Sequence, residues 1–79
     1  MVDDKIIYGI LHELNDSADF ENIQDFMENG VLDSIDIMTL VELLEDHFAI
    51  EIGGKDIIPD NFRNVDTICR LVEKYGGSL

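Results

Sequence analysis

Apolar residues recur at helical spacing in three stretches of the chain. The stripe in residues 34–48 consists of Ile37, Leu40, Val41, Leu44 and Phe48. A similar stripe in residues 2–14 consists of Ile7, Ile10, Leu11 and Leu14. The third stripe, in residues 64–75, consists of Val65, Ile68, Cys69, Val72 and Tyr75. Because an alternation of period two is nowhere sustained, the pattern predicts three long helices and no strands.

The segments between these stretches predict two shorter features. Residues 16–32 form a long connection whose scattered apolar side chains should hold it against the core, with a helical turn at about residues 23–28. Residues 56–61 predict a brief helix limited by Pro59. We expect Met27 and Met38 to line soft parts of the core. The sum is an all-α fold, a small four-helix bundle of three long helices and one short helix, forming a single domain over residues 1–79.

Size and charge narrow the functions that this chain can have. A chain of 79 residues buries only roughly 60% of the surface of its unfolded state, so a deep enclosed active site is hard to build. Its 18 acidic and 5 basic residues give a net charge of −13. Binding to phosphates depends on clustered Lys and Arg, so nucleic acid and anionic membranes are poor partners. Proteins with basic patches are the expected partners.

The lone cysteine and the first residues of the chain indicate the cellular compartment in which the protein is expected. Cys69 excludes an internal disulfide framework, and its helical spacing predicts a small buried hydrophobic residue. The first residues lack a basic segment followed by an apolar run, and no apolar stretch approaches the length needed to span a bilayer. We therefore expect a cytoplasmic monomer that does not insert into membranes.

A serine stands at the predicted start of the central helix, where residues 30–36 read Gly-Val-Leu-Asp-Ser-Ile-Asp. In one interpretation this is only a helix cap, with Asp33 or Ser34 accepting hydrogen bonds from first-turn amides and Asp36 completing a box. In the other, Ser34 is a covalent attachment point. A phosphate joined to Ser34 would lie at the positive end of the helix dipole, a gain of ~0.3–1 kcal/mol that Asp33 and Asp36 oppose.

The face of the central helix beside Ser34 is a candidate docking surface for partner proteins. The exposed line predicted there consists of Ile35, Thr39, Glu42 and Asp46. Its flanks consist of Asp33, Asp36, Leu43 and Glu45. The alternative is a merely solvated helix face. Apolar side chains on an exposed side, Ile35 and Leu43, favour docking.

Catalysis by the chain itself is not expected. Ser34 lacks the Gly-x-Ser-x-Gly turn of hydrolases, and His12 and His47 stand on separate predicted helices with no ligand pair at metal spacing. The sequence therefore predicts no catalytic residue and no metal site. A small acidic helical adaptor without a covalent cofactor is the alternative to a modified protein.

The segment Asp33-Ser34-Ile35-Asp36, leading into an acidic amphipathic helix, resembles the acyl carrier protein family, including peptidyl and aminoacyl carrier domains. The resemblance covers nearly the whole chain. It includes the length, the acidity, the long first connection, Gly30-x-x-Asp33-Ser34, and Ile58-Pro59-Asp60-Asn61-Phe62 followed by Val65-x-x-Ile68. Ile35 stands where Leu is most usual. The approach Gly-Val-Leu-Asp-Ser is more similar to aminoacyl carriers, such as those for D-alanine, or to carriers of specialised pathways, than to housekeeping fatty-acid carriers.

The resemblance implies a cofactor and a set of partners. A phosphopantetheinyl transferase, using coenzyme A and Mg²⁺, would attach 4′-phosphopantetheine covalently to Ser34. The thiol of this arm, and not Cys69, would hold an acyl or aminoacyl group as a thioester, as in fatty acid, polyketide or nonribosomal peptide biosynthesis. A loading enzyme and a downstream acyltransferase or synthase, each with a basic docking patch, would be the further partners.

Overall fold

The computed structural model describes residues 2–77, which form seven helical elements and no strands. The α-helices are α1 (Asp4–Leu14), α2 (Phe26–Asn29), α3 (Ser34–Phe48) and α4 (Val65–Lys74). The 3₁₀ turns are η1 (Phe20–Asn22), η2 (Gly54–Asp56) and η3 (Pro59–Phe62). The predicted all-α fold with three long helices is confirmed.

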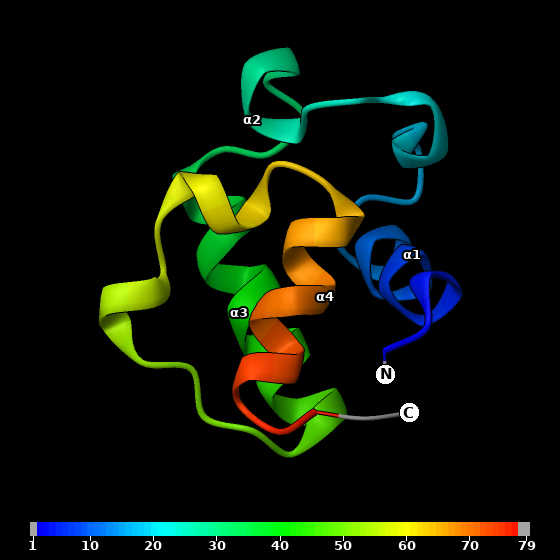
Figure 1. The fold of residues 1–79 in the computed structure, drawn as a ribbon. Helices are drawn as coiled ribbons and strands as arrows, with labels where there is room; N and C mark the ends of the chain where they lie inside the picture. The colour runs from blue at the N-terminus through cyan, green and yellow to red at the C-terminus, as the bar shows by residue number, and fades with distance from the viewer. Residues whose placement is uncertain (1, 78–79) are drawn as a thin grey trace.

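The three long helices enclose one core (Figure 1). Helix α1 packs against both α3 and α4, and η3 packs against α4 and α2. The largest fully buried side chains come from every part of the chain: Phe20, Phe26, Phe62, Ile7, Ile10, Leu11, Leu40, Leu44, Ile68 and Val72. The amide of Val2 donates to Glu73 Oε2 at 2.8 Å, so the chain before α1 is tied to the end of α4.

Helix boundaries follow the residues that cap them. The predicted helix over residues 34–48 is confirmed at both ends, where Asp33 caps its start and Ala49 adopts the left-handed conformation at its end. Helix α1 begins two residues later than expected, because the Asp3 side chain accepts the amide of Lys5 and fixes the N-cap there. Asn64 caps α4 in the same way through the amide of Thr67.

The long first connection is held against the core as expected. Its aromatic side chains Phe20 and Phe26 are buried and meet edge to face, with ring centroids 5.4 Å apart. The predicted turn at residues 23–28 lies later, at α2, because Asp25 accepts the amides of Met27 and Glu28 and so starts the helix at Phe26.

Two expectations about local structure are wrong. The predicted brief helix over residues 56–61 is replaced by the separate turns η2 and η3. Ile58, the second of the two residues between them, precedes Pro59 and is extended (φ −127°, ψ 152°), as steric contact with the proline ring requires. Met38 does not line the core: its side chain is 57% exposed, whereas Met27 is half-buried and packs on the core.

Candidate functional site

Ser34 is the first residue of α3 and is exposed. The residue before it, Asp33, makes the cap: its Oδ1 accepts the amide of Asp36 at 2.8 Å, and Asp36 Oδ2 accepts the amide of Asp33 at 3.2 Å. Within residues 2–77, the Ser34 hydroxyl forms no hydrogen bond. The predicted capping box is therefore present, but it leaves Ser34 out, so the serine oxygen is free for other chemistry.

The conformation of residues 30–33, which precede Ser34, is fixed by a glycine and by a buried leucine. Gly30 ends α2 in the left-handed conformation (φ 84°), which a residue with a β-carbon adopts only with strain. Leu32 is buried, and its amide donates to the carbonyl of Phe26 at 3.3 Å. The side chain at position 32 therefore anchors the loop in the core immediately before the cap and the exposed serine.

The outward face of α3 combines apolar and acidic side chains. Ile35 is 75% exposed, and Thr39, Glu42 and Asp46 are exposed along the same helix, as expected. Met38, one turn beyond Ser34, adds a second exposed apolar side chain that sequence reasoning assigned to the core. Its position three residues after Ile35 was the available signal, because such residues share a helix face.

The structure places two predicted flanking residues differently from the expectation. Leu43 is half-buried and packs on the core, so it does not belong to the exposed apolar surface. Glu45 is also half-buried, and its Oε2 accepts the amide of Ile52 at 2.9 Å. Glu45 therefore holds the chain that follows α3. Of the other flanking residues, Asp33 is exposed, and Asp36 is half-buried in the capping box.

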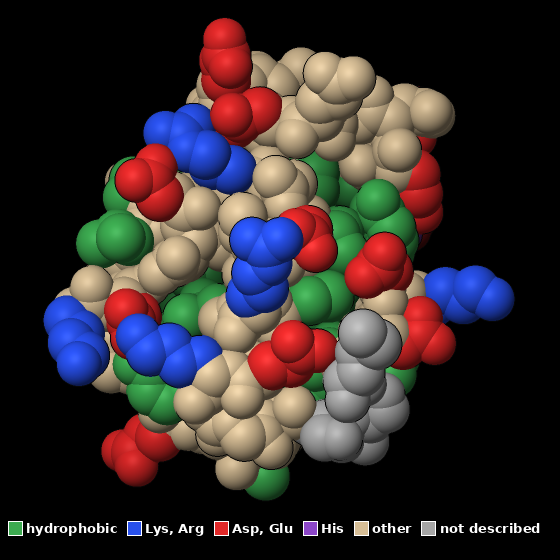
Figure 2. Space-filling view, in the orientation of Figure 1, with side chains coloured by type: hydrophobic (Ala, Val, Ile, Leu, Met, Phe, Trp, Pro, Cys, Tyr) green, Lys and Arg blue, Asp and Glu red, His purple; other side chains and the backbone are tan. Residues whose placement is uncertain are grey.

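Charge is distributed very unevenly along this chain. No Lys or Arg occurs between Lys5 and Lys55, whereas residues 1–54 contain 14 of the 18 acidic residues. Residues 55–79 contain four acidic and four basic residues. Residues 1–54 (the acidic region) therefore carry the whole net charge, and residues 55–79 (the balanced region) carry none. Figure 2 shows the resulting mixture of positive and negative side chains on the face formed by α4 and the 3₁₀ turns.

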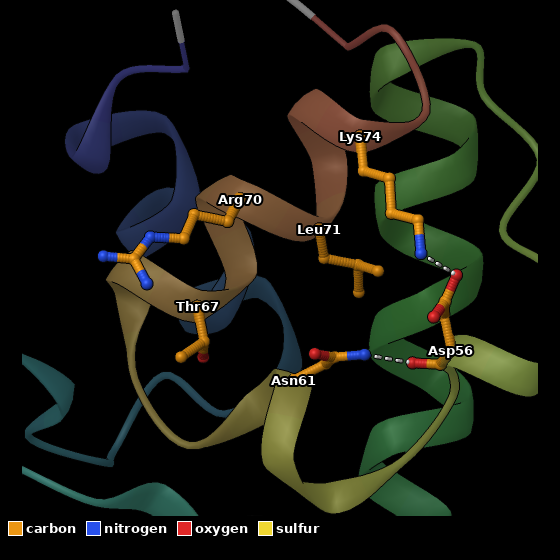
Figure 3. Close-up of a pocket in the computed structure, with 6 residues that line it drawn as sticks. All are labelled: Asp56, Asn61, Thr67, Arg70, Leu71 and Lys74. Atoms are coloured by element: carbon orange, nitrogen blue, oxygen red, sulfur yellow. Dashed lines mark hydrogen bonds and ion pairs between the residues drawn. The ribbon is translucent and has the colours of Figure 1, made fainter.

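A shallow pocket of about 200 Å³ lies in the balanced region, and Ser34 is not among the residues that line it (Figure 3). Its lining residues are Asp56, Asn61, Thr67, Arg70, Leu71 and Lys74. Lys74 Nζ contacts Asp56 Oδ2 at 2.9 Å, the Tyr75 hydroxyl donates to the same oxygen, and Asn61 Nδ2 donates to the Asp56 carbonyl at 2.7 Å. The hydrogen bond from Tyr75, followed by that from Lys74, lowers the pKa of Asp56. These contacts join η2 and η3 to α4 and give the pocket a structural role.

Cys69 and His12, two other side chains that could supply a nucleophile or a base, contact neighbouring elements of the fold. Burial, and then a hydrogen bond to Asp4, raises the pKa of the Cys69 thiol to about 12, so the thiolate is scarce at neutral pH. His12 Nε2 lies 3.0 Å from Glu21 Oε2 and its ring meets the edge of Phe20, which fixes the first connection to α1.

Among the helices of residues 2–77, none combines the length and the apolar character needed to cross a bilayer.

Comparison with known proteins identifies the family. A family model described as the phosphopantetheine attachment site matches residues 7–72, which include Ser34, its capping box and all of α3. Comparison with the curated proteins and with the solved structures gave no match. The matched range runs from within α1 to near the end of α4, so it includes most of the helical core. This chain belongs to the phosphopantetheine attachment family, whose domains carry covalently bound 4′-phosphopantetheine.

Proposed function

We propose that Ser34 is the attachment residue and that the protein is a non-catalytic carrier of acyl or aminoacyl groups. The observation that carries the proposal is that the residue that caps α3 is Asp33 and not Ser34. The exposed Ser34 hydroxyl has no hydrogen-bond partner within residues 2–77. An enzyme can therefore take the serine oxygen without breaking the cap.

The chemistry that this arrangement supports is a transfer performed by another enzyme. Ser34 Oγ would give its proton to a base of a phosphopantetheinyl transferase and form a bond to phosphorus, while the nucleotide part of coenzyme A leaves with the electrons of the broken P–O bond. The amides at the start of α3 favour the new phosphodiester by ~0.3–1 kcal/mol. Asp33 and Asp36 oppose it, so the transferase must supply the remaining electrostatic stabilisation.

The surface around Ser34 supports docking of enzymes that have basic, partly apolar patches. We define the docking face as the half-buried Asp36 together with the exposed residues before and after the serine: Asp33, Ile35, Met38, Thr39, Glu42 and Asp46. Ile35 and Met38 would fill apolar depressions on a partner, and the acidic rim would speed its approach. Leu43 and Glu45 border this face, and their contacts with the core and with Ile52 keep it in place. The same face would serve the transferase, the loading enzyme and the acceptor.

The approach to Ser34 supports an aminoacyl or specialised-pathway cargo. Its residues, Gly30-Val31-Leu32-Asp33, resemble those of aminoacyl carriers, such as carriers of D-alanine, or of specialised-pathway carriers, more than those of housekeeping fatty-acid carriers. The cargo would be bound as a thioester to the thiol of the arm. An adenylating enzyme that activates an amino acid as its adenylate would be the loading partner, and transfer of radiolabelled D-alanine to the modified protein would test this choice.

The decisive experiment follows the intact mass of the protein. Protein made without the arm is incubated with coenzyme A, Mg²⁺ and a broad-specificity phosphopantetheinyl transferase. We expect the wild type and Ser17→Ala, which changes another exposed serine, to gain one phosphopantetheine each. Ser34→Ala should gain none. A mass gain in Ser34→Ala would move the attachment to another residue, and no gain in the wild type would overturn the carrier function.

A further inference from the structure

Arg63 connects two segments that are far apart in the sequence. It follows η3, and its Nη1 lies 3.1 Å from Oδ2 of Asp25, the residue that caps α2. Its Nε lies 2.8 Å from Oδ1 of Asp60 within η3. One guanidinium group therefore joins a carboxylate of the first connection to a carboxylate of the second.

A backbone contact lies beside this ion pair and continues toward Ser34. The amide of Phe26 donates to the Arg63 carbonyl at 2.6 Å, and the Phe26 carbonyl accepts the amide of Leu32 at 3.3 Å. Leu32 is followed directly by Asp33, which caps the helix that begins with Ser34. A continuous series of contacts thus runs from Arg63 through α2 to the residue before the serine.

Helix α2 depends on such contacts for its position. It has only four residues, far fewer than an isolated helix needs to be stable in water. An isolated exposed ion pair contributes little, but Arg63 is about half-buried and contacts two carboxylates while its own carbonyl binds the α2 backbone. Side-chain and backbone contacts at one residue can hold a short element that its own hydrogen bonds cannot.

We propose that Arg63 is a positioning residue for modification of Ser34, because its contacts with Asp25 and with the α2 backbone fix the loop that presents the serine. The proposal depends on Ser34 being the attachment residue. Arg63 lies outside the docking face and need not contact the transferase. Loss of its guanidinium contacts would leave the backbone bond to Phe26 as the remaining tie at this residue, and α2 and residues 30–33 would sample arrangements that the transferase does not bind.

A charge-matched pair of variants provides the main test. Arg63→Gln and Arg70→Gln each remove one positive charge, but among residues 2–77 the only ion pair of Arg70 is within α4, with Asp66 at 2.7 Å. We expect Arg63→Gln to lower kcat/KM for phosphopantetheine transfer about tenfold, mainly through KM, because only the competent fraction of the carrier binds. Arg70→Gln should stay within about twofold of the wild type, since both variants alter long-range attraction equally.

A second pair of variants separates the ion pair from the helix cap. Asp25→Asn keeps a residue that caps well but removes the charge that faces Arg63. It should also raise KM, and the double variant Asp25→Asn/Arg63→Gln should be no worse than Arg63→Gln alone, because both changes break one interaction. Arg63→Lys, which retains the charge, should recover part of the loss.

Amide hydrogen exchange shows whether the effect is local. The Leu32 amide should exchange faster in Arg63→Gln than in the wild type, whereas the Leu44 amide, in the buried middle of α3, should be unchanged. If the wild type is modified while Arg63→Gln and Asp25→Asn match Arg70→Gln in KM, this inference is wrong and the carrier function stands. If the wild type is not modified, both fail. Should Arg63→Gln not fold, Asp25→Asn alone decides, and wild-type behaviour would overturn the inference.

Discussion

The acidic region and the balanced region differ in whether their charged side chains are neutralised by ion pairs. In the balanced region, Arg63, Arg70 and Lys74 all pair with nearby carboxylates, and the Lys74–Asp56 pair connects α4 to η2. In residues 6–54 there is no Lys or Arg to neutralise the carboxylates of α3. Repulsion among these carboxylates lowers the stability of the folded state.

This difference shows that a small carrier domain can use separate regions for stabilising ion pairs and for charges that face a partner. The balanced region uses charge to hold irregular segments together, at Asp56 and Arg63. The acidic region contains Ser34 and the proposed docking face, where unneutralised carboxylates would be available to a basic partner. Arg63 links the two, because it is the residue of the balanced region that pairs with Asp25 in the acidic region.

Reversing one charge in each region should give the largest difference between the two regions in the rate of arm transfer. Glu42→Lys on the docking face and Asp66→Lys at the start of α4 change the net charge equally. We expect Glu42→Lys to lower kcat/KM for arm transfer about tenfold at low salt, because it places a like charge before a basic patch. Asp66→Lys should change it by less than about twofold, while losing some stability with its Arg70 pair. Steady-state kinetics measure both variants, and equal losses would remove α3 as the docking face.

Salt should stabilise the protein through the acidic region. Raising the ionic strength from about 0.01 M to about 1 M shortens the Debye length from about 30 Å to about 3 Å. Repulsion among the carboxylates then weakens, and each kcal/mol gained raises Tm by about 4–8 °C in a domain of this size. We expect Tm, followed by circular dichroism, to rise with NaCl and with divalent cations. A flat or falling series would show that the ion pairs of the balanced region outweigh the repulsion.

Neutralising one carboxylate in each region should change Tm in opposite directions, by smaller amounts. At pH 7, Asp56→Asn should lower Tm, because it breaks the contacts with Lys74 and Tyr75. Asp46→Asn, near the C-terminus of α3, should raise Tm, since it removes a negative charge from the unfavourable end of the helix dipole.

The pH dependence of the Asp56 effect has a definite sign. Because the folded state lowers the pKa of Asp56, its contribution is fully present above the ordinary value of about 3.9. It is lost as the pH falls through the lower value of the folded protein. The Tm difference between the wild type and Asp56→Asn should therefore be constant at neutral pH and shrink below about pH 4. A difference that grows in acid would contradict this assignment.

Much of the site could be predicted because it depends on neighbours in sequence. The cap of α3 and its bounds follow from a short-range pattern, so residues 34–48 were predicted correctly at both ends. The exposure of Met38 differs from what its apolar side chain suggests, because its position three residues after Ile35 places it on the same outward helix face. The pairing of Arg63 with Asp25 spans 38 positions, and only the folded chain brings these residues together.

The burial of Cys69 makes the protein convenient to study. The chain has no other cysteine, and with a pKa of about 12 that thiol is almost entirely protonated near neutral pH. A maleimide would therefore label the flexible arm and spare the polypeptide. The wild-type carrier could then report the fraction of empty arms directly, with no need to remove the cysteine first.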